Sequence, residues 1–294
     1  MTVSGLINVH KPPGMTSREA VDCVKRWVRP AKVGHAGTLD PLASGVLVVA
    51  IGAATRLIEY VQAMPKRYTG TFLLGRESDT EDIEGVVQML HDPPRPNLDE
   101  VRRAAAGLTG PIEQRPPAFS ALKVKGRRAY DLARAGEAVE LAPRPVTIYR
   151  LDVKRFEYPE LTLDIECSSG TYVRSLGRDL AAAIGTAAVM SALVRTAIGS
   201  FRLEDACRPG QLDGETVRHQ LLPALRAVGA LPPIELSDEQ ISRVGHGLPI
   251  PRPADLQGIS TAGEVAAVSR SGELVAILAL RGDEQLWPVR NLAR

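Results

Sequence analysis

Residues 34–47 read GHAGTLDPLASGVL, a stretch in which glycines and a proline crowd around one carboxylate, Asp40. The apolar run from Val46 to Ile51 follows at once, and it predicts a buried strand. An Asp-Pro step favours a turn, and loops held by a rigid scaffold often carry catalytic residues. Spacing alone leaves two interpretations of Asp40 open, a catalytic carboxylate and a residue that caps a turn.

The remaining patterns mix helices and strands without the strict alternation of a doubly wound sheet. Thr16 and Glu19 have the spacing of a capping box, which predicts the start of a helix. Polar and apolar residues alternate over 69–74 and again over 161–166, and each stretch predicts a strand. A further helix is predicted over 176–184, ended by Gly185. This mixture indicates an α+β fold.

The character of the chain changes near the Leu-Pro-Pro sequence at 231–233. Short β-like runs follow at 265–268, 274–280 and 286–289. The part beyond residue 232 has six basic and eight acidic residues, a net charge of −2 against +4 for the rest. We therefore expect a main domain over 1–231 and a small β domain over 232–294, the latter near the lower size limit for independent folding.

Composition indicates a packed globular protein: 294 residues, 44% hydrophobic and 24% charged. The three cysteines, Cys23, Cys167 and Cys207, lie far apart without CxxC spacing, so they predict neither a zinc site nor a disulfide framework. They fit a reducing cytosol. No secretory leader is evident, and the longest apolar run is far short of the ~20 residues that cross a bilayer. We expect a soluble, cytoplasmic protein.

The distribution of charge is more informative than the net charge of +2. Between Arg102 and Arg155 there are twelve basic and five acidic residues, a local excess of seven. Such a strip is typical of a solvated basic face, and it is also what a phosphate backbone requires. Charge by itself does not decide between these interpretations.

Several chemistries are excluded by their missing motifs. The sequence has no G-x-x-x-x-G-K-[ST] phosphate loop and no G-x-S-x-G nucleophile elbow. Residues 79–85, DTEDIEG, are similar to the start of a calcium loop, but Ile83 stands where the third oxygen ligand belongs. The five histidines have no metal-like pairing. From the residues alone, the chain is an enzyme or an RNA binder, and no metal is expected.

Six motifs, in order along the chain, closely resemble those of the TruB family of pseudouridine synthases. They cover most of residues 5–200, and Ala36 is a small departure, since that position commonly bears a hydroxyl. Residues 245–250, GHGLPI, and the strands after them resemble more weakly the PUA-type RNA-binding domain of the bacterial members. The six motifs are KPPGMTS at 11–17, GHAGTLDPLASGVL at 34–47, KRY at 66–68, RPPAFSALK at 115–123, RPV at 144–146 and CSSGTYVRSL at 167–176.

The resemblance implies a pseudouridine synthase fold, with a mixed, largely antiparallel sheet flanked by helices and loops, plus the small PUA-type β domain. It implies an isomerase that converts uridine 55 in the T loop of tRNA to pseudouridine. The N1–C1′ bond breaks, the uracil turns, and the ring is rejoined through C5. Because no group is gained and no redox change occurs, no cofactor is expected.

The resemblance also implies roles for particular residues. Asp40 is the catalytic carboxylate, either as a nucleophile or as the base that takes the C2′ proton, and both mechanisms stay open. Tyr68 is expected to stack on the flipped uracil and Arg174 to pair with Asp40, so both count as catalytic. His35 fills the space that the base leaves, and Tyr172 and Leu176 line the pocket.

The basic strip then gains a role as an insertion, about residues 102–144, that clamps the T arm. Its phosphate-binding side chains are expected to be Lys123, Lys125, Arg127 and Arg128. The implied partner is tRNA, bound by a monomer with no required protein partner and no membrane. Two rivals remain, the catalytic subunit of a guide-RNA-directed synthase and a non-catalytic RNA-binding protein or tRNA-folding chaperone.

Overall fold

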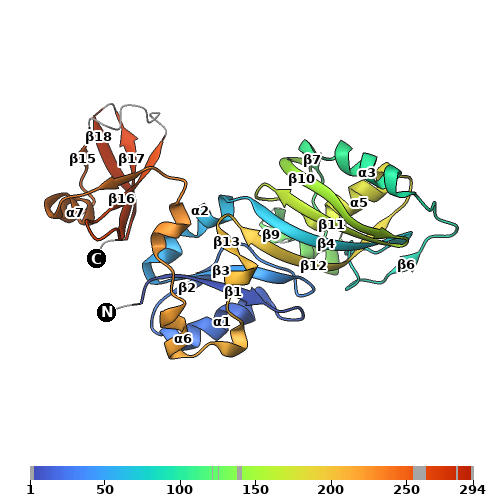
Figure 1. The fold of residues 1–294 in the computed structure, drawn as a ribbon, viewed down its shortest axis with the longest axis horizontal. Coiled ribbons are helices and arrows are strands. Elements are labelled where there is room, and N and C mark those ends of the chain that lie inside the picture. The colour runs from blue at the N-terminus through green and yellow to red at the C-terminus, as the bar shows by residue number, and fades with distance from the viewer. Residues whose placement is uncertain are drawn as a thin grey trace.

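The computed structural model describes residues 3–120, 122–124, 126–137, 141–253, 263–282 and 284–292. A nine-stranded sheet runs through the main part of the molecule, and a separate five-stranded sheet lies at one end (Figure 1). The nine strands are β1 (Gly5–Lys11), β2 (Val33–His35), β3 (Ser44–Ile51), β4 (Lys66–Leu74), β7 (Gly110–Gln114), β10 (Arg144–Glu157), β11 (Glu160–Cys167), β12 (Ala188–Ile198) and β13 (Phe201–Arg202).

The order of the large sheet is β1-β3-β12-β4-β11-β10-β7, with β2 beside β3 and β13 beside β12. Among its described pairs, only β3 and β12 run parallel. This parallel pair lies next to the β1 edge of the sheet, and it sets Gly45, just after the Asp40 loop, opposite Arg195. The α+β fold predicted from the sequence is confirmed.

Helices α1, α3 and α5 cover the large sheet, and each buries apolar side chains against it. The amphipathic helix α1 buries Val21, Val24 and Val28 against β1 and β3, and it begins with the predicted capping box of Thr16 and Glu19. Helices α3 and α5 pack against the other end of the sheet. The helices are α1 (Ser17–Val28), α2 (Ile58–Ala63), α3 (Leu98–Gly107), α4 (Ala129–Arg134), α5 (Val173–Ala183), α6 (Gly214–His219) and α7 (Asp238–Gly245), with short 3-10 turns η1 (Gly52–Leu57), η2 (Leu203–Asp205), η3 (Pro209–Gln211) and η4 (Ala224–Val228).

The predicted strands fall where expected, but one helix begins earlier than its sequence pattern suggests. Helix α5 starts at Val173 rather than at residue 176. Gln114 of β7 supports this start, since its amide accepts from the Tyr172 N–H at 2.8 Å and donates to the Tyr172 carbonyl at 3.1 Å. A side chain 58 positions away thus supports the backbone where the helix begins, and a local pattern carries no trace of it.

Two short hairpins extend from the large sheet, and the second sheet begins at Pro233. Its curled form is consistent with a PUA-type domain, while the division of the chain at residues 231 and 232 stays a prediction. The hairpins are β5 (Arg76–Glu77) with β6 (Gln88–Met89), and β8 (Lys123–Val124) with β9 (Arg127–Arg128). The second sheet has β14 (Pro233–Glu235), β15 (Ile250–Pro251), β16 (Glu264–Val268), β17 (Leu274–Arg281) and β18 (Gln285–Asn291). No described helix is long and apolar enough to cross a membrane.

Candidate active site

The loop that carries Asp40 joins β2 to β3, and packing and hydrogen bonds hold it in place. Leu39 and Ala43 bury their side chains in the core that the sheet forms with α5. The Ser17 hydroxyl at the start of α1 donates to the Leu39 carbonyl at 3.0 Å and accepts from its N–H at 2.9 Å. The Gly14 N–H donates to the Pro41 carbonyl at 2.8 Å. The loop is therefore held at residues on both sides of Asp40.

Lys11 supports the same loop from the end of β1. Its side chain has no exposed surface, and its Nζ donates to the carbonyls of Pro12 at 2.9 Å and Met15 at 2.6 Å. A longer contact of 3.4 Å reaches the Pro41 carbonyl. Burial lowers the pKa of Lys11 to about 8, although the nearby charge of Asp40 opposes this shift. Lys11 therefore supports the backbone around the Asp40 loop.

Arg174 forms an ion pair with Asp40, with Nη2 at 3.0 Å from the carboxylate. The Arg174 side chain is only 8% exposed, whereas that of Asp40 is 43% exposed and so remains open to a substrate. Arg174 lies in the first turn of α5, where the helix dipole disfavours a cation. Its position therefore depends on acceptors supplied by other segments.

A second carboxylate, Asp82, holds Arg174 from the opposite side. Its Oδ2 lies 3.4 Å from Nη1 of Arg174, and its side chain is 4% exposed. The arginine also donates to the carbonyls of Thr80 at 2.7 Å and Phe119 at 3.1 Å. Arg174 thus bridges one buried and one accessible carboxylate.

The sequence does not indicate that Asp82 belongs to this network. Residues 79–85 are similar in sequence to the start of a calcium loop, whereas in the structure this segment holds Arg174. Asp82 receives hydrogen bonds from the Thr80 hydroxyl at 2.6 Å and the Glu84 N–H at 3.0 Å. Glu81 beside it pairs with Arg178 one turn along α5. The one available signal was a cluster of acidic residues between two strands.

In the described ranges no three His, Cys, Asp or Glu side chains form a metal-binding group.

Tyr68 lies on β4, in the centre of the sheet, and is half-buried. Burial is the main reason that the pKa of its hydroxyl is raised, and the charge of Arg195 opposes that rise. Arg195 on β12 is the register partner of Tyr68 and is 2% exposed. This arginine lies inside a strand with no motif around it, so the sequence alone does not indicate its place in the site.

The other residues that the resemblance suggests for the pocket occupy different surroundings. His35 ends β2 and is half-buried, and burial followed by the charge of Arg195 lowers its pKa. Tyr172 precedes α5, and the guanidinium of Arg144 lies 4.8 Å from the centre of its ring. Leu176 is fully buried in the core, so it presents no surface to a base in this structure. The substrate-binding roles of all three stay predictions.

The basic insertion is described only in part. Arg127 on β9 forms an exposed ion pair with Glu137 at 2.9 Å, so in the free protein its charge is already engaged. Lys125 lies outside the described residues, and the side chains of Lys123 and Arg128 are not described either. Their contacts with phosphates stay predictions.

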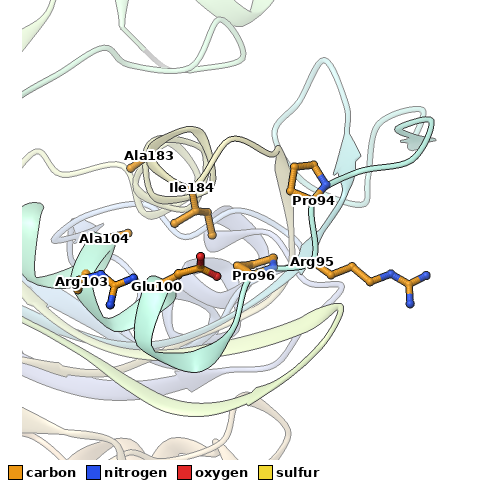
Figure 2. Close-up of a pocket in the computed structure, with 8 residues that line it drawn as sticks. All are labelled: Pro94, Arg95, Pro96, Glu100, Arg103, Ala104, Ala183 and Ile184. Atoms are coloured by element: carbon orange, nitrogen blue, oxygen red, sulfur yellow. The ribbon is translucent and has the colours of Figure 1, made fainter.

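A surface pocket lies between the segment 94–96, α3 and the end of α5 (Figure 2). Its lining includes Pro96, Glu100, Arg103 and Ile184, and it contains neither Asp40 nor Tyr68 nor Arg174. The lining of this pocket is therefore distinct from the residues around Asp40.

An accessible carboxylate held by a buried arginine, beside a tyrosine and a second buried arginine, is suited to act as a nucleophile or base on a substrate that covers it. The TruB family pseudouridylate synthase (N terminal domain) model matches residues 25–173. Similar proteins include "tRNA pseudouridine synthase B" of Arthrobacter sp. (strain FB24), 43% identical over 95% of this chain and 94% of its own. The protein of the same name from Thermobifida fusca (strain YX) is 42% identical over 83% and 85%.

Solved structures agree with this match. A chain of an H/ACA RNP bound to a substrate RNA containing 2′-deoxyuridine is 25% identical, with a TM-score of 0.75 over 99% of this chain and 85% of that one. A chain of a Cbf5-Nop10-Gar1 complex is 27% identical, with a TM-score of 0.75 over 98% and 84%. Fold and matches define an enzyme of the pseudouridine synthase class, an isomerase. The chain belongs to the TruB family of pseudouridylate synthases.

Proposed function

We propose that this enzyme isomerises uridine 55 in the T loop of tRNA to pseudouridine, and that it does so on free tRNA without a guide RNA. The relatives named tRNA pseudouridine synthase B match nearly the whole chain at 40–43% identity, and they support tRNA as the substrate. The observation that carries the proposal is the ion pair of Asp40 and Arg174, in which only the carboxylate is accessible.

Asp40 supplies the charge that the chemistry needs. Breaking the N1–C1′ bond leaves the electron pair on the uracil ring, and a carboxylate then either attacks C1′ or removes the C2′ proton. Arg174 compensates the negative charge of Asp40 when a flipped base closes the site and excludes water. A planar guanidinium suits this task because it holds a carboxylate and does not lose its own proton.

Tyr68 stacks on the flipped uracil and handles the proton at C5. Extruding a base from a folded loop costs a few kcal/mol, and base–aromatic stacking recovers about 1–3 kcal/mol. His35 and Tyr172 complete the pocket, and the insertion around Arg127 clamps the T arm through its phosphates. The enzyme acts as a monomer in the cytoplasm and needs no cofactor.

The alternative, action within a guide-directed complex, has one observation in its favour, since the two solved structures described above are an H/ACA RNP and a Cbf5-Nop10-Gar1 complex. The higher identity of the relatives named tRNA pseudouridine synthase B favours independent action on tRNA. Purified protein, given an unmodified tRNA transcript and nothing else, distinguishes the two. Pseudouridine mapped at position 55 supports the proposal. No product without a guide RNA and partner proteins contradicts it.

Asp40→Asn tests the chemistry at the same time. The amide keeps the shape but loses charge and basicity, so we expect near-normal tRNA binding and no pseudouridine. Asp152→Asn is the matched control, because Asp152 lies on β10 in an exposed pair with Arg150. Substantial turnover by Asp40→Asn in single-turnover reactions would disprove the role of this carboxylate.

A further inference from the structure

Arg195 is a buried cation without a carboxylate in contact with it. Only 2% of the residue is exposed, and among the ion pairs of the described residues none includes Arg195. Burying an unpaired charge is costly, so such a group persists when its interactions compensate or when function requires it. Arg195 also lowers the pKa of Lys11, His35 and Lys66, which shows that its charge acts on the whole neighbourhood of the site.

The hydrogen bonds of Arg195 go to both ends of the loop that carries Asp40. Its Nε donates to the Val46 carbonyl at 2.7 Å, and its Nη2 donates to the Gly37 carbonyl at 3.0 Å. Strands β3 and β12 approach each other very closely at this point, since a Cβ atom added at Gly45 would lie 2.2 Å from the Arg195 carbonyl oxygen. The guanidinium therefore occupies one defined place beside the loop.

Tyr68 faces the same guanidinium from the neighbouring strand. Arg195 and Tyr68 are directly opposite in the antiparallel pair of β12 and β4, so their side chains lie on one face of the sheet. The charge of Arg195 acts to lower the pKa of the Tyr68 hydroxyl, against the effect of burial. The other ionisable groups that act on Tyr68 are Cys167 of β11 and Asp40 of the loop, and both make its ionisation harder. Arg195 is the group that opposes them.

We propose that Arg195 is a positioning residue that ties the Tyr68 hydroxyl to the Asp40 loop and stabilises Tyr68 in its ionised form for removal of the C5 proton. This inference rests on the proposed function of the site. Partial burial and these two neighbouring groups favour the neutral phenol, and a permanent cation at the facing position of the next strand opposes them.

The proposed step transfers the C5 proton to Tyr68. Once C5 is bonded to C1′, the C5–H bond breaks and its proton moves to the phenolate oxygen of Tyr68. The electron pair forms the C5–C6 double bond, and the pair of the N1–C6 double bond moves to N1, which takes a proton from solvent. Tyr68 returns its proton to solvent. No oxidant, reductant or other co-reactant is needed.

The first experiment titrates Tyr68 in the free protein and needs no activity. The absorbance of tyrosinate is followed against pH in the wild type and in Tyr68→Phe, and the difference between them reports Tyr68 alone. The same difference is measured in Arg195→Met and Arg195→Lys backgrounds. We expect the Tyr68 titration to move to higher pH in Arg195→Met and to return part of the way in Arg195→Lys. An unmoved titration in both would overturn the inference.

The second experiment follows the C5 proton itself. Single-turnover rates are compared on tRNA carrying uridine and on tRNA carrying uridine deuterated at C5. Each unit by which the Tyr68 pKa rises reduces the ionised fraction about tenfold at a pH below it. We therefore expect Arg195→Met to raise the ratio of the two rates, and Arg195→Lys to lower it again. Arg155→Met is the matched control, since Arg155 is exposed and pairs with Glu157.

The outcomes separate this inference from other causes. A ratio of rates does not depend on how much protein is folded, so a purely structural role of Arg195 slows both substrates and leaves the ratio unchanged, and that result contradicts the proposal. If the wild type forms no pseudouridine at all, the proposed function fails instead, while the titration still reports on the contact of Arg195 with Tyr68. A raised ratio together with a shifted titration supports the proposal.

Discussion

Arg174→Met is the substitution whose consequences the structure defines best. It removes two ion pairs at once, with Asp40 at 3.0 Å and with Asp82 at 3.4 Å. It also removes donors to the carbonyls of Thr80 and Phe119. The two carboxylates differ in exposure, 43% for the Asp40 side chain and 4% for that of Asp82, so the two losses have different effects.

At an effective dielectric constant of about 20, either pair is worth about 5 kcal/mol of Coulomb energy before solvation. Water screens the pair with Asp40, and an exposed pair contributes only about 0–1 kcal/mol to stability. Asp82 is left charged and buried, a change that typically costs about 3–5 kcal/mol. Because domains have only about 5–15 kcal/mol to lose, we expect Arg174→Met to fold but to be clearly less stable. The loss of stability comes from Asp82 and the loss of catalysis from Asp40.

The double variant Arg174→Met with Asp82→Asn separates these effects. The asparagine keeps an oxygen for the Thr80 hydroxyl and the Glu84 N–H but leaves no orphaned charge. We expect urea unfolding to show most of the lost stability restored, while single-turnover pseudouridine formation stays slower by orders of magnitude. An unfolding free energy of Arg174→Met equal to that of the wild type would refute the argument about Asp82. A near-normal chemical step would refute the argument about Asp40.

Three further predictions concern other residues. Tyr68→Leu should lose much activity because stacking is worth about 1–3 kcal/mol. Tyr68→Phe keeps the stacking, so its rate measures the contribution of the hydroxyl. Equal, near-normal single-turnover rates for both variants would exclude a role of Tyr68 in the pocket. Reversing the charges of Lys125, Arg127 and Arg128 should weaken tRNA binding and flatten the slope of log affinity against log salt, and an unchanged slope would mean that they do not contact the backbone. Burial lowers the pKa of Lys11 to about 8, so the folded chain binds fewer protons than the unfolded chain between about pH 8 and 10.5. Stability should therefore rise with pH across that window, and this rise should be absent in Lys11→Met. Unfolding measured at several pH values tests both expectations.

Local sequence determined a large part of the fold. The capping box at Thr16 and the alternation over 69–74 each produced the predicted element, because helix starts and half-buried strands depend on residues within a few positions of one another. The run after Asp40 became the buried strand β3 for the same reason. Motif resemblance then indicated Asp40 and Arg174, and the structure places these two side chains in contact.

Tertiary structure alone decided what surrounds that pair. Arg174 meets the Asp82 segment across 94 positions of sequence, and Arg195 meets the Gly37 carbonyl across 158. Such contacts are set by strand order and register, above all by the parallel pairing of β3 and β12, and residue spacing does not encode them. Leu176 shows the same limit, since its motif does not indicate that the packing of α5 buries this side chain in the core. Local periodicity specifies which face of an element is apolar, but only the assembled sheet determines which charges face one another.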